Sequence, residues 1–267
     1  MSPKTLYILS ARLWAVISFF VMIAVNVLAN LLPLNGITTG QVSEKFPTLF
    51  TPAPATFAIW GLIYMLLAAY TFRQSGVLQR LKDSEDDVDS DKIRLAFSLS
   101  SLLNACWLFA WHSLQIGWSL ILLLLLFFCL AYIYLLTRKE KPACEKLVFL
   151  RIPFSVYFGW ITVAAIANLA VYAASASWDL YVSAETVWTM FLLISGLIVG
   201  GCIICRFRDA VYGAVMLWAY GGILIRHLSA SGLAGQHPLI VITIVLCLTV
   251  FTLVILWPLL GKKAGKR

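Results

Sequence analysis

Charged side chains are scarce in this sequence. Asp, Glu, Lys and Arg make up 12% of the 267 residues, whereas hydrophobic residues make up 61% and the mean hydropathy is +0.91. A soluble domain carries about 25% charged residues, because water must solvate its surface. The composition therefore excludes a soluble domain and indicates a membrane protein.

A regular alternation of apolar and polar residues is also missing, which excludes the strands of a membrane barrel. Residues 121–129, for example, form one unbroken apolar run. A helix that crosses a bilayer needs about 20 mostly apolar residues. We therefore expect an all-α, polytopic transmembrane helix bundle of about eight spans. The expected spans are Leu13–Leu34, Phe57–Phe72, Leu95–Trp111, Trp118–Leu136, Leu147–Ala174, Val187–Cys205, Ala210–Leu228 and Leu239–Leu260.

No Lys, Arg, Asp or Glu lies at the centre of a predicted span. Proton pumps, ion-coupled transporters and voltage sensors usually carry such groups, because these side chains move or coordinate the charge. Their absence weakens the hypothesis of an ion-coupled transporter. It does not remove that hypothesis, since backbone carbonyls also bind ions.

The sequence contains no Ser-His-Asp set, no HExxH and no phosphate loop, so it gives little support to an enzyme and predicts no catalytic residue. No metal ligand is predicted either. The acidic segment Asp83–Lys92 departs from a calcium loop, because Lys92 and Ser98 stand where Gly and Glu are needed, and we expect a solvated linker there. None of the six cysteines lies in an outside loop, which argues against a disulfide framework.

The basic residues are distributed unevenly. If the N terminus is inside and the chain crosses eight times, all but two of the 20 Lys and Arg fall inside, the exceptions being Lys45 and Arg226. Short loops rich in Lys and Arg stay on the cytoplasmic side. We therefore expect a multi-pass protein of the cytoplasmic (plasma) membrane with both termini inside and the first span as a signal anchor. The net charge of +8 suits anionic lipid headgroups better than nucleic acid.

What the spans do contain is carboxamide and indole. Asn26, Asn104 and Asn168 lie in predicted spans, and the chain has ten Trp. An intramembrane Asn is costly unless it is paired, so each is expected to face protein. One interpretation is structural, with Asn joining helices and Trp marking the membrane interfaces. The other is a site for a flat, aromatic, mostly apolar ligand.

Four motifs, in order, resemble those of the TspO/MBR family of translocator proteins and tryptophan-rich sensory proteins. The second span has a proline-rich start, then Phe57 and the core Trp60-Gly61-x-x-Tyr64. The third span has Asn104-x-x-Trp107, and Gly117-Trp118 leads into the fourth. The fifth span carries Trp160, Ala164 and Asn168 at the family's separations.

The resemblance covers roughly residues 13–174, with departures. Phe57 lies three residues before Trp60 and Pro153 seven before Trp160, where we expect four in each case. Three further spans follow from Val187, as in a longer subgroup of the family. We therefore expect two domains, a TspO-like five-helix transmembrane bundle at 1–175 and three additional transmembrane helices with a basic C-terminal tail at 176–267.

The resemblance implies a pocket that opens toward the first long loop, Asn35–Thr56, and binds porphyrins, sterols and synthetic aromatic ligands. No cofactor is required, although a porphyrin or haem-like molecule is a candidate ligand. The expected partners are membrane lipids, a hydrophobic small molecule and, by family analogy, a second copy in a homodimer. The candidate ligand-binding residues are Trp60, Tyr64, Asn104, Trp107, Trp118, Trp160, Ala164 and Asn168.

The leading hypothesis is thus a membrane protein that binds an aromatic or polycyclic ligand of the porphyrin (tetrapyrrole) or sterol class, for transport or sensing. A small-molecule permease and an intramembrane scaffold for a partner protein are the alternatives. Axial haem ligation by His112, His227 or His237 is the weaker idea, because all three lie near outer span ends where solvation is expected.

Overall fold

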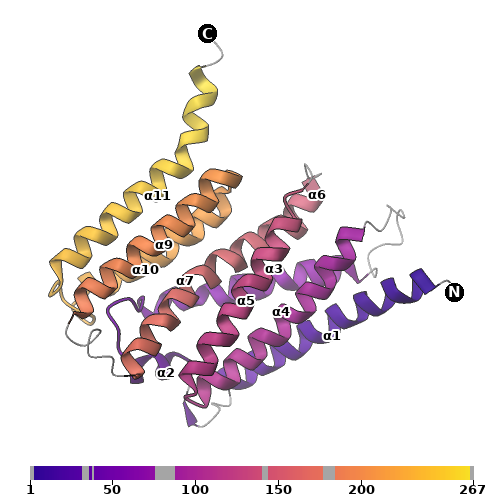
Figure 1. Cartoon of the computed structure of the whole chain (residues 1–267), viewed down its shortest axis with the longest axis horizontal. Helices are drawn as coiled ribbons and strands as arrows, with labels where there is room; N and C mark the ends of the chain where they lie inside the picture. The colour runs from indigo at the N-terminus through magenta and orange to yellow at the C-terminus, as the bar shows by residue number, and fades with distance from the viewer. Residues whose placement is uncertain are drawn as a thin grey trace. The chain divides into compact units, whose positions relative to one another are not determined.

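The computed structural model describes residues 3–31, 36–37, 39–75, 88–139, 144–176 and 184–264. Every regular element within these ranges is a helix (Figure 1). Eight helices are long and apolar enough to cross a membrane. The predicted all-α, polytopic bundle of about eight spans is therefore confirmed.

The described part of the chain contains long helices and short helical elements. The long ones are α1 (Pro3–Leu31), α3 (Ile59–Gln74), α4 (Val88–His112), α5 (Ile116–Leu136), α7 (Ile152–Ser175), α9 (Glu185–Phe207), α10 (Ala210–Leu228) and α11 (Pro238–Ala264). The short ones are α2 (Thr39–Lys45), the 3-10 helix η2 (Pro54–Ala58), α6 (Cys144–Lys146) and the π-helical turn η3 (Leu147–Arg151).

The first span is shifted relative to its prediction. Helix α1 begins at Pro3 rather than Leu13, and the predicted end at 32–34 lies outside the described residues. Arg12 lies within the helix, because one charged residue does not stop a helix that has no Gly or internal Pro. A long Arg side chain can run along the helix toward the membrane surface, so the charge is tolerated near a span end.

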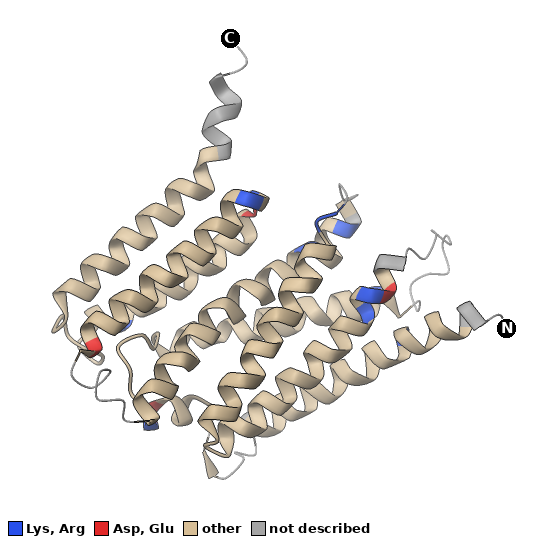
Figure 2. Cartoon of the chain, in the orientation of Figure 1, with Lys and Arg blue, Asp and Glu red and all other residues tan. Residues whose placement is uncertain are grey.

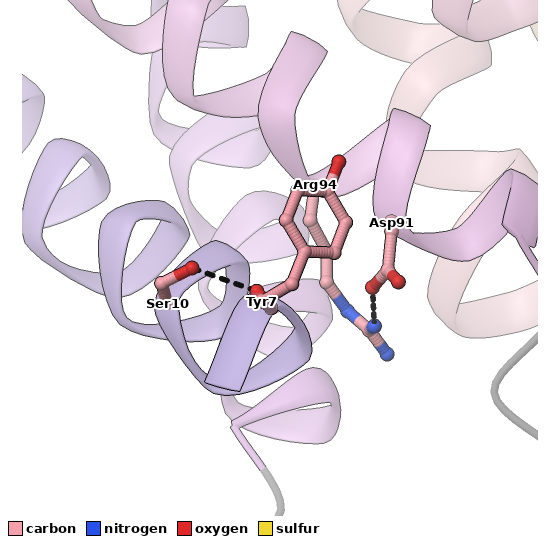
Figure 3. A network of polar contacts seen from close by, with 4 residues as sticks. All are labelled: Tyr7, Ser10, Asp91 and Arg94. Carbon is pink, nitrogen blue, oxygen red and sulfur yellow. Dashed lines mark hydrogen bonds and ion pairs between the residues drawn. The ribbon is translucent and has the colours of Figure 1, made fainter. Parts of the chain in front are cut away.

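The acidic segment is partly helical, which corrects the expected linker. Helix α4 begins at Val88, and Asp91 is buried against Arg94 one turn later, with which it forms an ion pair (Figure 3). Such a pair stabilises the first turn of the helix. Residues 83–87 of the segment lie outside the described part of the chain.

Charged residues gather at the ends of the long helices, whose middles are almost uncharged (Figure 2). Large apolar side chains such as Met65, Phe128 and Trp257 are exposed instead. In water such faces would drive association, whereas hydrocarbon solvates them at no cost. The arrangement is what a lipid-embedded bundle requires.

The chain separates into two compact units. The first comprises Met1–Val42 and Trp60–Phe158, and the second Ser43–Ile59 and Gly159–Arg267. Because this division passes through the first long loop and through α7, it does not follow the expected domain boundary at residue 175. That boundary came from family resemblance rather than from packing, and it stays a prediction.

Within the first unit α4 packs between α1 and α5. Within the second unit α9, α10 and α11 pack on one another, and α10 also contacts η2. The Gly196-x-x-x-Gly200 pair of α9 allows this close packing, since a Cβ at Gly196 would lie 2.4 Å from the Tyr220 hydroxyl of α10. A Cβ at Gly200 would lie 2.8 Å from Met216, which is also on α10.

Local capping separates α9 from α10. Arg208 adopts a left-handed conformation (φ 50°) that ends α9. The Asp209 carboxylate then accepts hydrogen bonds from the amides of Val211 (3.0 Å) and Tyr212 (3.2 Å) at the start of α10. These amides have no partner inside the helix, so the carboxylate is an N-cap.

We expect Asp209→Ala to lower the free energy of unfolding by about 1 kcal/mol, because it removes this N-cap. Asp209→Asn keeps an acceptor oxygen and should cost much less. Thermal unfolding of the detergent-solubilised protein measures both changes. Equal losses in the two variants would contradict the capping role.

Candidate functional site

Two carboxamides and two phenols form a hydrogen-bonded chain inside the first unit. The Tyr64 hydroxyl of α3 donates to Oδ1 of Asn26 on α1. The Asn26 amide donates to Oδ1 of Asn104 on α4 at 2.9 Å, and the Asn104 amide donates to the Tyr157 hydroxyl of α7 at 3.1 Å. Four helices are thus joined through side chains that, apart from Tyr64, are buried.

The network gives hydrogen-bond partners to polar atoms that are fully buried in the first unit. Asn104 and Tyr157 have no exposed surface, and lipid offers no hydrogen bond in place of a lost one. The Asn26 amide also donates to the Met22 carbonyl of its own helix, at 2.9 Å. Because both polar atoms of the Asn104 side chain already have partners, its first role is to fix the positions of α1, α4 and α7.

Aromatic rings lie against the network in a row. Trp60 stacks on Tyr64 (centroids 5.5 Å apart, planes at 22°) and on Trp107 (6.0 Å, 24°). Trp107 in turn stacks on Trp111 (6.3 Å, 25°), while Tyr157 presents its ring at a steep angle to Trp60 (6.2 Å, 66°). The row arises because Trp60 and Tyr64 are one turn apart on α3, as are Trp107 and Trp111 on α4.

The two indole N–H groups of α4 differ in their surroundings. Trp111 donates to the Thr39 carbonyl at 3.1 Å, which fastens the start of α2 to the end of α4. The Trp107 N–H is buried and has no hydrogen-bond acceptor among the residues that the structure describes. An unpaired buried donor costs about 1–3 kcal/mol, so an incoming acceptor that bonds to this group would relieve that cost.

The second unit has its own aromatic and polar contacts along α7. Trp160 is buried and meets Phe57 edge-on, with centroids 5.8 Å apart. Ala164 and the buried Asn168 follow on the same face of the helix, since positions four apart are neighbours. The Tyr212 hydroxyl of α10 donates a hydrogen bond to the Thr162 hydroxyl at 2.9 Å.

The structure therefore brings Trp60, Tyr64, Asn104 and Trp107 together, as the ligand hypothesis requires. Trp160, Ala164 and Asn168 share one face of α7 in the other unit. Trp118 differs, because its side chain is 64% exposed at the start of α5, as expected of an interfacial indole. Ligand binding by any of the eight residues stays a prediction.

Three members of the cluster were absent from the candidate set. The sequence could have indicated Asn26 and Trp111, because they are an amide and an indole within predicted spans. Tyr157 carried almost none, since a Tyr in an apolar helix is most often a packing residue.

The expected solvation of the histidines is wrong for two of them. His112 is buried, with its Nε2 3.0 Å from the Thr39 hydroxyl. His227 is also buried, and its Nε2 donates to the Leu49 carbonyl at 2.8 Å. In the described ranges no three His, Cys, Asp or Glu side chains gather as metal ligands would.

The eight apolar helices define an integral, multi-pass membrane protein. A family model described as TSPO-like protein matches residues 12–257, and the chain belongs to this family. The match extends through most of α11, well beyond residue 174, where the motif resemblance ended. Comparisons with curated proteins and with solved structures gave no match.

We expect Tyr157→Phe to lower the free energy of unfolding by about 1 kcal/mol or more, because it leaves an Asn104 N–H without its acceptor. Tyr132→Phe is the matched control, since Tyr132 is exposed on α5. Thermal unfolding in detergent compares the two. If Tyr132→Phe costs as much as Tyr157→Phe, the hydrogen-bonded chain does not stabilise the first unit.

Proposed function

We propose that this protein binds a flat, rigid, mostly apolar molecule of the porphyrin (tetrapyrrole) or sterol class through Trp60, Tyr64, Asn104 and Trp107. The observation that carries the proposal is the unpartnered indole N–H of Trp107 within a row of stacked rings. Indole faces supply a large contact area for a polycyclic body. One N–H supplies a single directional anchor, which suits a ligand with few polar atoms.

The roles within the cluster differ. Trp60 and Trp107 offer ring faces, and Trp107 also donates a hydrogen bond to an acceptor oxygen, such as a porphyrin carboxylate or a sterol hydroxyl. Asn104 holds its helix in register with α1 and α7, because Asn26 and Tyr157 already occupy its polar atoms. Trp160, Ala164 and Asn168 are kept as a second candidate set on α7, with Trp118 the weakest candidate because it is exposed.

Trp107→Phe keeps an aromatic ring but removes the N–H, so we expect the dissociation constant for protoporphyrin to rise about threefold to tenfold. Trp60→Ala should weaken binding further, because it removes a whole ring face. Quenching of Trp fluorescence during a titration with protoporphyrin measures both.

Trp257→Phe is the control, since Trp257 is exposed on α11 in the other unit. Dissociation constants for Trp60→Ala and Trp107→Phe equal to that of the control would rule out this site. Weakening by Trp160→Ala alone would move the site to α7.

Transport, sensing and scaffolding make different demands on the same cluster. A small-molecule permease would give substrate flux in reconstituted vesicles. A scaffold would retain its partner protein even when Trp60 or Trp107 is replaced. We favour binding for transport or sensing, because the stacked rings have no evident use in a scaffold. A homodimer surrounded by membrane lipids is the assembly that family analogy favours.

We also propose that both termini face the inside of the cytoplasmic membrane. Support comes from the placement of Lys and Arg and from the eight apolar helices, since an even number of crossings returns the chain to its starting side.

A green fluorescent protein fused after Arg267 should therefore fluoresce, and an alkaline phosphatase fused there should be inactive. Fusions after Ala234, in the turn between α10 and α11, should behave in the opposite way. An active phosphatase at the C terminus would overturn the orientation.

A further inference from the structure

The proline-rich end of the first long loop and the 3-10 helix η2 together form the segment Pro47–Ala58, which we call the strap. It belongs to the second unit together with α9, α10 and α11. Four consecutive residues of the strap, Thr48 to Thr51, are buried although they form no regular helix or strand. Three prolines remove backbone donors from the segment. Some of the remaining backbone groups pair within the strap, as the Thr51 N–H does with the Thr48 carbonyl at 3.3 Å, and others need partners outside it.

Side chains of two C-terminal helices bind the backbone of Leu49 from both sides. The Leu49 N–H donates to the carboxylate of Glu185, the first residue of α9, at 3.1 Å. The Leu49 carbonyl accepts from Nε2 of His227, near the end of α10, at 2.8 Å. One peptide residue is thus held by both an acid and an imidazole.

A second pair of hydrogen bonds fixes the end of the strap to the middle of α10. The Ala53 N–H donates to the Gly222 carbonyl at 3.0 Å. One turn earlier, the Trp218 indole donates to the Thr56 carbonyl at 2.9 Å. Both contacts use backbone groups of the strap. They therefore fix the position of its backbone and do not depend on which side chains it carries.

Gly222 makes the close approach possible. A Cβ at this position would lie 2.1 Å from Oγ1 and 2.6 Å from Cγ2 of Thr56. The adjacent Gly221 is different, since a Cβ there would have nothing within 4 Å. Of the two adjacent glycines, only Gly222 is therefore needed for the strap to pack against α10.

We infer that α9 and α10 form a receptor for the strap, and that the C-terminal helices thereby anchor the chain that leads into α3. The strap continues through Ile59 directly into Trp60, so its attachment fixes the chain immediately before the first ring of the aromatic row. Release of the strap frees the start of α3 and speeds ligand exchange at Trp60. This last step rests on the proposed function.

The attachment is tested first without ligand, by hydrogen exchange of the full-length protein in nanodiscs. Gly222→Ala forces Thr56 away and should raise the exchange rate of the strap amides, including Leu49 and Ala53, by about threefold to tenfold, the range for loss of one hydrogen bond. Gly221→Ala should leave the rate unchanged. Unchanged amide protection in α4 and α5 verifies that the first unit remains folded.

A milder variant guards against misfolding of Gly222→Ala. Trp218→Phe keeps the ring and removes only the N–H that binds Thr56, and Trp257→Phe is its control. Faster strap exchange in Trp218→Phe alone supports the receptor. Strap exchange at the wild-type rate in both Gly222→Ala and Trp218→Phe overturns it.

Ligand exchange is tested second, by stopped-flow dissociation of protoporphyrin. The dissociation rate should rise in Gly222→Ala by a factor similar to that of strap exchange, and stay unchanged in Gly221→Ala. Faster strap exchange with an unchanged dissociation rate would overturn the link to Trp60 but leave the receptor. Failure of the wild-type protein to bind protoporphyrin would contradict the proposed function, while the exchange result still decides the receptor.

Discussion

Hydrocarbon cannot donate or accept a hydrogen bond, and the pairing of buried polar side chains in the described helices follows from that fact. Carboxamides and phenols in the first unit pair with one another across four helices. In the second unit, the irregular residues Thr48 to Thr51 are buried, and side chains of α9 and α10 bind the backbone of Leu49. The Trp107 N–H is one of several buried side-chain groups with no hydrogen-bond partner among the described residues, and it directs attention to a ligand because it lies within the row of stacked rings.

The two units use similar chemistry for different purposes. In the first, hydrogen bonds between side chains keep α1, α3, α4 and α7 in register and present a row of stacked rings. In the second, hydrogen bonds from side chains to backbone hold one particular segment in place. The first arrangement suits recognition of a rigid molecule, and the second suits control of when the chain ahead of Trp60 is free to move.

Much of the fold could be predicted from the sequence, because a long apolar run has few alternatives in a bilayer. Span ends were less certain, as α1 and α4 show, since charged residues such as Arg12 and Arg94 continue a helix when they can pair or reach the surface. Motif spacing identified Trp60, Tyr64, Asn104 and Trp107 as candidates, yet it could not separate them from the exposed Trp118. Tyr157 and the burial of His112 and His227 depend on tertiary contacts that no local pattern encodes.

The chain passes between the two compact units three times, within the first long loop, before Trp60 and inside α7. The C-terminal helices therefore do not form a separate domain that truncation at one position would remove intact. A protein shortened after α7 would leave the backbone of Leu49 without its partners Glu185 and His227, and the Ala53 N–H without the Gly222 carbonyl. Acquisition or loss of these helices during evolution would thus have required compensating changes in a loop more than a hundred residues earlier.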